Sequence, residues 1–226
     1  CIFCLNVLFH GGFIMQLLGQ NYWGGVCGFV SVIHGILLSK NDGDALDGLS
    51  QNELEYNLGL SILAFLRYAK VSKPEVASEL VRFTQAFGGV HAHKTIDSLI
   101  QECQKSVEAI KGGTNGAKAT ESGWGVAMTK NALIAYINWI GARATEVPHN
   151  GVWSKQNLSS FRNCVCGVGD TAQRNSEFLG LRHWVYINDA GYMYNWGAKT
   201  EMNNSAERPY AGMAHHNYLV HVLQLG

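Results

Sequence analysis

Cys27 is the residue of this sequence best suited to act as a nucleophile. It stands in the stretch GGVCGF, residues 24–29, directly before an apolar segment that has helical spacing. A thiol reacts as its thiolate, and a helix N-terminus favours that anion through its unpaired N–H groups and the positive end of its dipole. The sequence therefore predicts a reactive cysteine at the start of a helix.

Donors for an oxyanion lie close to this cysteine in the sequence. The N–H of Cys27 itself could bind a developing oxyanion, and Asn21 or Gln20 could add a side-chain donor. Flanking glycines would leave room for a substrate backbone, and these are Gly24, Gly25 and Gly28.

A cysteine nucleophile needs a base, and the chain has nine histidines. His34 follows Cys27 by seven residues on the same expected helix, about 10 Å away, too far for a hydrogen bond. His91 and His93 form a loop pair that could bind metal or be solvated, and His149 belongs to a turn. The histidines near the last strand are interpreted as surface or edge residues, because they have no acidic neighbours in the sequence; these are His215, His216 and His221. His10 lies in the N-terminal segment that is set apart below, so His183 is the remaining candidate.

A hairpin should hold His183 in place. His183 opens the strand HWVYIN, and the returning strand YMYNWG carries Asn195 at its far end, with Asp189, Ala190 and Gly191 as the turn. Asn195 can accept the ring N–H and so fix the tautomer and plane of the imidazole. Trp196 can shield this contact from water, while Asp189 and Asn188 are competitors for the orienting role.

The elements that position these residues change character along the chain. Apolar residues recur at helical spacing in residues 27–39, 54–68, 72–87, 95–110 and 129–140. Ser72, Pro74 and Glu75 form a capping-box pattern for the third helix, and Thr95 can cap the fourth. The glycine-rich stretch 111–125 is interpreted as a connection between two subdomains.

Strands follow the helices. Short aromatic and β-branched runs, ATEVP, NCVCGVG, HWVYIN, YMYNWG and YLVHVLQL, alternate with turns. Helices first and strands later predict an α+β protein with a helical lobe and an antiparallel sheet lobe, and a site in the cleft between them.

Composition excludes several kinds of partner. Seventeen basic and seventeen acidic residues cancel in 226 residues and form no long block, so neither nucleic acid nor an anionic membrane is expected as a partner. No apolar run approaches the roughly 18 residues needed to cross a bilayer.

The N-terminal segment is set apart from the fold. LNVLFHGG, residues 5–12, looks like an altered viral-protease tag site, so residues 1–14 are interpreted as a tag remnant or an N-terminal extension, with Met15 as a candidate start. Cys1 and Cys4 carry no functional assignment for that reason.

The other cysteines are expected to be structural. Cys103 falls on the apolar face of the fourth helix, and Cys164 and Cys166 share one face of a strand. A metal or redox role for the strand pair would need further ligands, so packing is the preferred interpretation.

The order of these parts resembles the papain-like cysteine peptidase superfamily. Residues 20–39 are similar to that family's oxyanion donor and nucleophile helix, and residues 183–197 to its His and Asn hairpin. The resemblance implies a single papain-like catalytic domain over 15–226, with a helical lobe at about 15–140 and a sheet lobe at about 141–226. It implies Cys27 as nucleophile, His183 as base, Asn195 as orienting residue, and Asn21 or Gln20 in the oxyanion hole.

The chain departs from the familiar family signature. The cysteine-rich and aromatic motif around the nucleophile is missing, and the interval from His to Asn is short. These features look like divergent bacterial members, including secreted effectors and toxins that cleave or deamidate proteins and that often use Asp in the third position. A secreted effector of this type would have a protein or peptide substrate and a cognate inhibitor or immunity protein as partners.

The sequence is compatible with three classes of function. The first is a thiol hydrolase without cofactor, a cysteine protease in preference to a glutamine deamidase or transglutaminase. The second is a papain-like binding module without turnover. The third is a metal-dependent enzyme that uses His91, His93 and cysteines, which predicts bound zinc.

Overall fold

The computed structural model describes residues 25–38, 51–111, 125–195, 197–211 and 213–226. In these ranges the helical part of the chain comes first. Its helices are α1 (Cys27–Leu38), α2 (Gln51–Ser72), α3 (Pro74–Gln85), α4 (Ile96–Lys111) and α6 (Lys130–Trp139), with a 3-10 turn η1 (Gly89–His91) before α4. The expected five-helix N-terminal half is confirmed.

The sheet is built by the second half of the chain. Its strands are β1 (Ala144–Glu146), β2 (Cys164–Gly169), β3 (Leu181–Ile187), β4 (Tyr192–Asn195), β5 (Ala198–Glu201) and β6 (Tyr218–Leu225), and the described residues pair as a six-stranded sheet in the order β1-β6-β2-β3-β4-β5. Every pairing is antiparallel. The mixed helix and antiparallel sheet architecture, α+β, is therefore as predicted.

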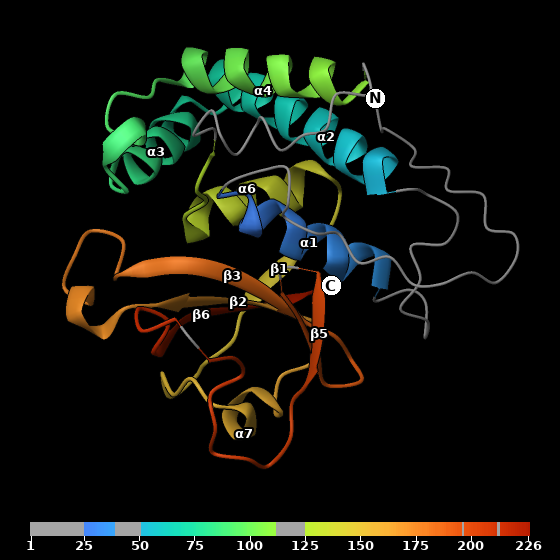
Figure 1. Cartoon of the computed structure of the whole chain (residues 1–226), viewed down its shortest axis with the longest axis vertical. Coiled ribbons are helices and arrows are strands. Elements are labelled where there is room, and N and C mark those ends of the chain that lie inside the picture. The colour runs from blue at the N-terminus through green and yellow to red at the C-terminus, as the bar shows by residue number, and fades with distance from the viewer. Residues whose placement is uncertain (1–24, 39–50, 112–124, 196, 212) are drawn as a thin grey trace, which may run out of the picture.

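The molecule is layered (Figure 1). Helices α2, α3 and α4 form an outer layer, α1 and α6 lie between them and the sheet, and the short helix α7 (Lys155–Leu158) lies beyond the other face of the sheet. One buried cluster joins the helices to the first face through residues such as Phe29, Tyr136 and Trp184. A second cluster fills the space under α7 with Cys166, Val185 and others. Both faces of the sheet are thus covered.

Helix α1 is buried on all sides because it lies between two layers. Phe29 makes edge contacts to Phe65 and Tyr136, with ring centroids 6.0 and 4.8 Å apart, on the side of the outer helices. On its other side α1 meets β3. The sequence pattern indicated one apolar face, but almost every described residue of the helix is apolar or small and is buried or half-buried.

Some local predictions failed for identifiable reasons. Ser72 ends α2 instead of capping α3, whose N-cap is Lys73 without a side-chain hydrogen bond, because α2 continues four residues beyond the expected Tyr68. By contrast, Thr95 accepts the N–H of Ser98 at 3.1 Å as expected. Strand β5 and helix α7 were not predicted, since neither is longer than four residues and their sequences are polar.

Close packing of α1 on the sheet depends on a glycine. A Cβ at Gly35 would lie 2.1 Å from Cδ1 of Leu225 and 3.1 Å from the ring of Tyr186. We expect Gly35→Ala to lower the free energy of unfolding by about 1–3 kcal/mol, because overpacking outweighs the helix propensity gained. Urea denaturation of both proteins tests this. A more stable variant would show that the helix can shift away from the sheet without loss.

Candidate active site

His183 and Asn195 are brought together by the hairpin of β3 and β4. The ring Nε2 of His183 lies 2.6 Å from Oδ1 of Asn195, and both side chains are buried. Because the amide oxygen only accepts, Nε2 carries the hydrogen, which leaves Nδ1 as the basic nitrogen of a neutral imidazole. The expected contact is therefore present, with the geometry of an oriented base.

Asn188 and Asp189, the two other candidates for orienting His183, lie in the turn of the hairpin and do not take this role. Asn188 accepts the N–H of Tyr192 at 2.8 Å and donates to the Tyr194 hydroxyl at 3.2 Å, so its amide serves the turn. Asp189 is exposed in the same turn. His183 and Asp189 are six residues apart along an extended strand, about 20 Å.

Cys27 is the first residue of α1, as predicted. Cys27 is 8% exposed, and burial raises the pKa of its thiol while the backbone N–H groups of Trp184, Gly28 and Cys27 itself lower it. Trp184 directly follows His183, so the N-terminus of α1 reaches the segment of β3 that carries the imidazole. The structure therefore packs α1 against the strand whose His183 is bound to Asn195.

Irregular strand pairing makes this approach feasible. The described pairing of β3 with β4 covers only Tyr186 and Ile187, so β4 does not follow β3 as far as Trp184. On the other side of β3, the register of β2 shifts between Val168 and Gly169. Bulges of this kind bend a strand and redirect its side chains. Here they occur at the same level as His183, which pairs with Val168.

Trp184 fixes the distance between α1 and β3. Its indole N–H donates to the carbonyl of Met128 at 2.8 Å. The side chain of Met128 in turn packs on Gly28, where a Cβ would lie 2.9 Å from its sulfur. Gly28 therefore serves the contact with Met128, which corrects the expectation that it leaves room for a substrate.

Burial keeps both partners of the pair uncharged. It raises the pKa of the Cys27 thiol to about 11, against the opposing effect of the three N–H groups. It lowers the pKa of His183 to about 3, against the opposing hydrogen bond to Asn195 and with a further decrease from His216. The thiol of Cys27 and the imidazole of His183 are therefore both uncharged at neutral pH.

Two further side chains adjoin this site. The ring of His216 is parallel to that of His183, with an angle of 5° and centroids 5.4 Å apart. Nδ1 of His216 lies 2.7 Å from the hydroxyl of Tyr210. Sequence reasoning missed both, because nothing in the spacing connects residues 210–216 with position 183.

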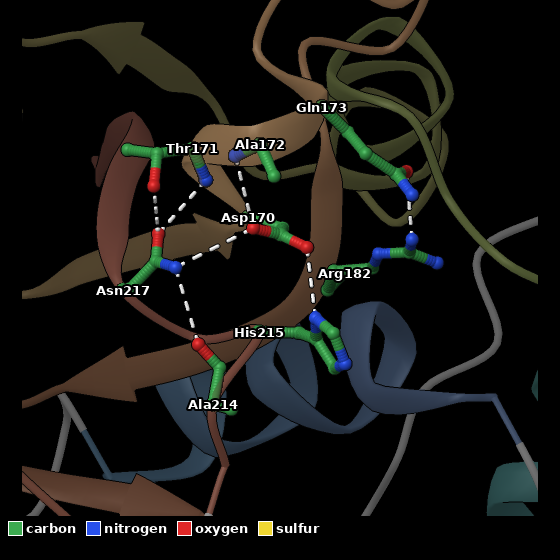
Figure 2. Close-up of polar contacts among 8 residues, drawn as sticks. All are labelled: Asp170, Thr171, Ala172, Gln173, Arg182, Ala214, His215 and Asn217. Atoms are coloured by element: carbon green, nitrogen blue, oxygen red, sulfur yellow. Dashed lines mark hydrogen bonds and ion pairs between the residues drawn. The ribbon is translucent and has the colours of Figure 1, made fainter.

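A polar network attaches the segment that carries His216 to the end of β2 (Figure 2). The carboxylate of Asp170 accepts from Nδ1 of His215 at 2.8 Å and from the amide of Asn217 at 3.4 Å. Asn217 also accepts the N–H and the hydroxyl of Thr171 at 2.8 and 2.9 Å. Since His215 and Asn217 flank His216, this network holds His216 over His183.

Of the three histidines expected at the surface or at an edge, His215 is exposed as predicted, whereas His216 and His221 are buried. His216 and His221 are each 9% exposed, while only His215 has an exposed side chain. Their acidic partners come from distant parts of the chain: Asp170 for His215 and Glu146 for His221, the latter at 3.5 Å. The sequence neighbourhood could not reveal either carboxylate.

The remaining candidates fall into structural roles. His34 is buried, His149 accepts the N–H of Gly151 in a turn, and Cys103 is fully buried in the helical core. Cys164 and Cys166 lie in the second core cluster as free thiols. Within the described ranges no three His, Cys, Asp or Glu side chains gather as metal ligands, and His91 and His93 belong to no such group.

Several predicted residues lie outside the described residues. These are Cys1, Cys4, Met15, Gln20, Asn21, Gly24 and Trp196, together with 112–124 of the connecting stretch. The side-chain donor of the oxyanion hole therefore stays a prediction. Over the part of the chain that is described, no helix has the length and apolar character to span a membrane.

Exchange of the orienting amide for a carboxylate gives a direct test of the His183 environment. We expect Asn195→Asp to raise the pKa of His183 by about 1–3 units, because a nearby negative charge favours the imidazolium. An NMR titration of the imidazole resonances measures this. Asn188→Asp, in the turn of the same hairpin, is the matched control, and an equal shift in both variants would contradict the contact.

The described residues thus contain a buried thiol at the start of α1, and on β3, which α1 packs against, an imidazole bound to the amide of Asn195. Comparison with known proteins assigns no family to it. No family model, no curated protein and no solved structure matches this chain.

Proposed function

We propose that this protein is a papain-like thiol hydrolase that cleaves a peptide or amide bond, most simply as a cysteine protease. The observation that carries the proposal is the 2.6 Å hydrogen bond between Nε2 of His183 and Oδ1 of Asn195, on the strand β3 against which α1 and its first residue Cys27 pack. This bond leaves Nδ1 of His183 as the base.

The reaction would begin from the neutral pair. Nδ1 of His183 takes the thiol proton as the Cys27 sulfur bonds to the substrate carbonyl carbon. The N–H groups of Cys27 and Gly28, at the start of α1, stabilise the negative charge that develops. The imidazolium returns its proton to the leaving amine, and water then hydrolyses the thioester. Catalysis by this route needs no metal or organic cofactor.

One observation favours a second candidate, a papain-like binding module without turnover. Burial of Cys27 raises the pKa of its thiol to about 11, far from the range of an activated nucleophile. A bound substrate that supplies dipoles to the site would restore reactivity in an enzyme, whereas in a binding module the thiol would stay inert.

The test compares the wild type with Cys27→Ala on a protein lysate. Mass spectrometry is expected to find new peptide termini that only the wild type produces. A glutamine deamidase would instead leave one-dalton mass gains on glutamine, and a transglutaminase would join glutamine to an amine. Identical profiles from the two proteins would refute an enzymatic role for Cys27.

A further inference from the structure

Tyr210 and His216 form a hydrogen-bonded pair beside the proposed triad, and neither has a part in the mechanism above. The hydroxyl of Tyr210 lies 2.7 Å from Nδ1 of His216, and the His216 ring is stacked on His183. Tyr210 is held from its other side by an edge contact with Trp153, with centroids 5.8 Å apart. The phenol is thus held by the side chain that stacks on the candidate base.

Tyr210 is also close enough to Cys27 for their charges to interact. A negative charge on the Cys27 sulfur raises the pKa of Tyr210, in addition to the larger effect of burial. The phenol therefore stays protonated at neutral pH and remains a hydrogen-bond donor. His216 stays neutral as well, because burial lowers its pKa to about 4.

The tautomer of His216 decides what the phenol does. When Nδ1–H of His216 donates to the Tyr210 oxygen, the hydroxyl directs its own hydrogen to another acceptor. An acceptor that bears a negative charge makes the stronger bond. The tetrahedral oxyanion formed at Cys27 is such an acceptor.

We propose that Tyr210 is a catalytic hydrogen-bond donor to the substrate carbonyl oxygen as it becomes an oxyanion, and that His216 is the residue that positions it. This inference rests on the proposed function. In the step concerned, the Cys27 sulfur bonds to the carbonyl carbon, the thiol proton passes to His183, and the carbonyl electron pair moves to the oxygen that Tyr210 binds. Collapse of this intermediate expels the leaving group and leaves an S-acyl Cys27.

The location of the pair also explains the network in Figure 2. Asp170 binds the residues on either side of His216, and these bonds fix the segment from Ala214 to Asn217 against η2 (Thr171–Gln173). A donor to an oxyanion must be held in place before the reaction, because a donor that reorganises loses most of its effect. The network supplies that rigidity.

Two reagents separate this role from the reactivity of the thiol itself. Iodoacetamide alkylates a thiol without forming an oxyanion, whereas p-nitrophenyl acetate acetylates it through one. We expect Tyr210→Phe to slow acetylation of Cys27 by about 10- to 100-fold and to leave its alkylation within about twofold of the wild type. Mass spectrometry of the Cys27 peptide and the release of p-nitrophenolate give both rates.

Matched variants control for packing and test the positioning role. Tyr218→Phe removes a buried hydroxyl that has no hydrogen-bond partner among the described residues, and should change neither rate. His216→Asn keeps a polar group near the position of Nδ1 and should retain most of the acetylation rate. His216→Leu should lose as much as Tyr210→Phe, and the double variant should lose no more, because the two residues act as a unit.

The outcomes distinguish the two proposals. Acetylation of the wild type no faster than that of Cys27→Ala would refute the proposed function and this inference with it. Acetylation that depends on Cys27 and His183 but is unchanged by Tyr210→Phe would refute the inference alone. An equal loss of both rates in Tyr210→Phe would also refute it, since the phenol would then act on the thiol.

Discussion

Replacement of His183 by alanine is expected to slow the alkylation of Cys27 by iodoacetamide about 100-fold at neutral pH. With the thiol pKa raised to about 11 by burial, very little thiolate exists unless a base takes the proton. General-base assistance by a positioned imidazole is typically worth a factor of about 10²–10⁴. Mass spectrometry of the labelled peptides over time gives the rate for each cysteine.

Other side chains supply the controls. Cys103 and Cys166 are fully buried in the two cores and should stay unlabelled in the native protein. His221→Ala removes another buried imidazole, on β6, and should lower stability without changing the Cys27 rate. Equal rates for Cys27 in the wild type and in His183→Ala would contradict the proposed pair and favour the binding module.

Acidification is expected to destabilise the fold steeply between about pH 6.5 and pH 4. Four buried histidines have a pKa lowered by burial: to about 4 for His34, His216 and His221, and to about 3 for His183. In this pH range the unfolded chain binds protons that the folded chain excludes, so the free energy of unfolding falls as pH falls.

The sign and size follow from proton linkage. Above pH 6.5 each such histidine is neutral in both the folded and the unfolded state, so stability does not depend on its protonation. Below pH 6.5 each lowers the free energy of unfolding by up to about 1.4 kcal/mol per pH unit, until the folded state also takes up the proton. Hydrogen bonds from His215 and Lys130 lower the pKa of the Asp170 and Glu146 carboxyls, respectively. Protonation of these carboxylates lowers the free energy of unfolding further at lower pH. Urea denaturation at a series of pH values measures the slope.

His34 provides the sharpest single test of this mechanism. Both of its ring nitrogens are buried without a hydrogen-bond partner among the described residues. We expect His34→Leu to reduce the slope by up to about 1.4 kcal/mol per pH unit while keeping or raising stability at pH 7.5. His93→Leu, at an exposed position, is the matched control for the substitution itself. An unaltered slope in His34→Leu would show that this imidazole is not excluded from protonation.

The sequence determined the elements whose signals are local. Helical spacing predicted α4 and α6, Thr95 predicted the N-cap of α4, and the Asp-Ala-Gly turn predicted the hairpin of β3 and β4. The same local logic placed Cys27 at the start of α1 and His183 within reach of Asn195. The register of a hairpin is fixed once its turn is known, so the contact between His183 and Asn195, twelve residues apart, could be inferred from their spacing.

Only the tertiary structure decided what surrounds that contact. His216 is stacked on His183, Tyr210 is hydrogen-bonded to His216, and Asp170 is hydrogen-bonded to His215, the neighbour of His216. These residues come from three separate stretches of the chain. Their association depends on the bulged register of β2 and on the packing of loops against it. Such long-range contacts leave no periodicity in the sequence, because each residue is placed by elements distant from it. For the same reason, the burial that keeps Cys27 and His183 neutral follows only from the packing of α1 between the outer helices and the sheet.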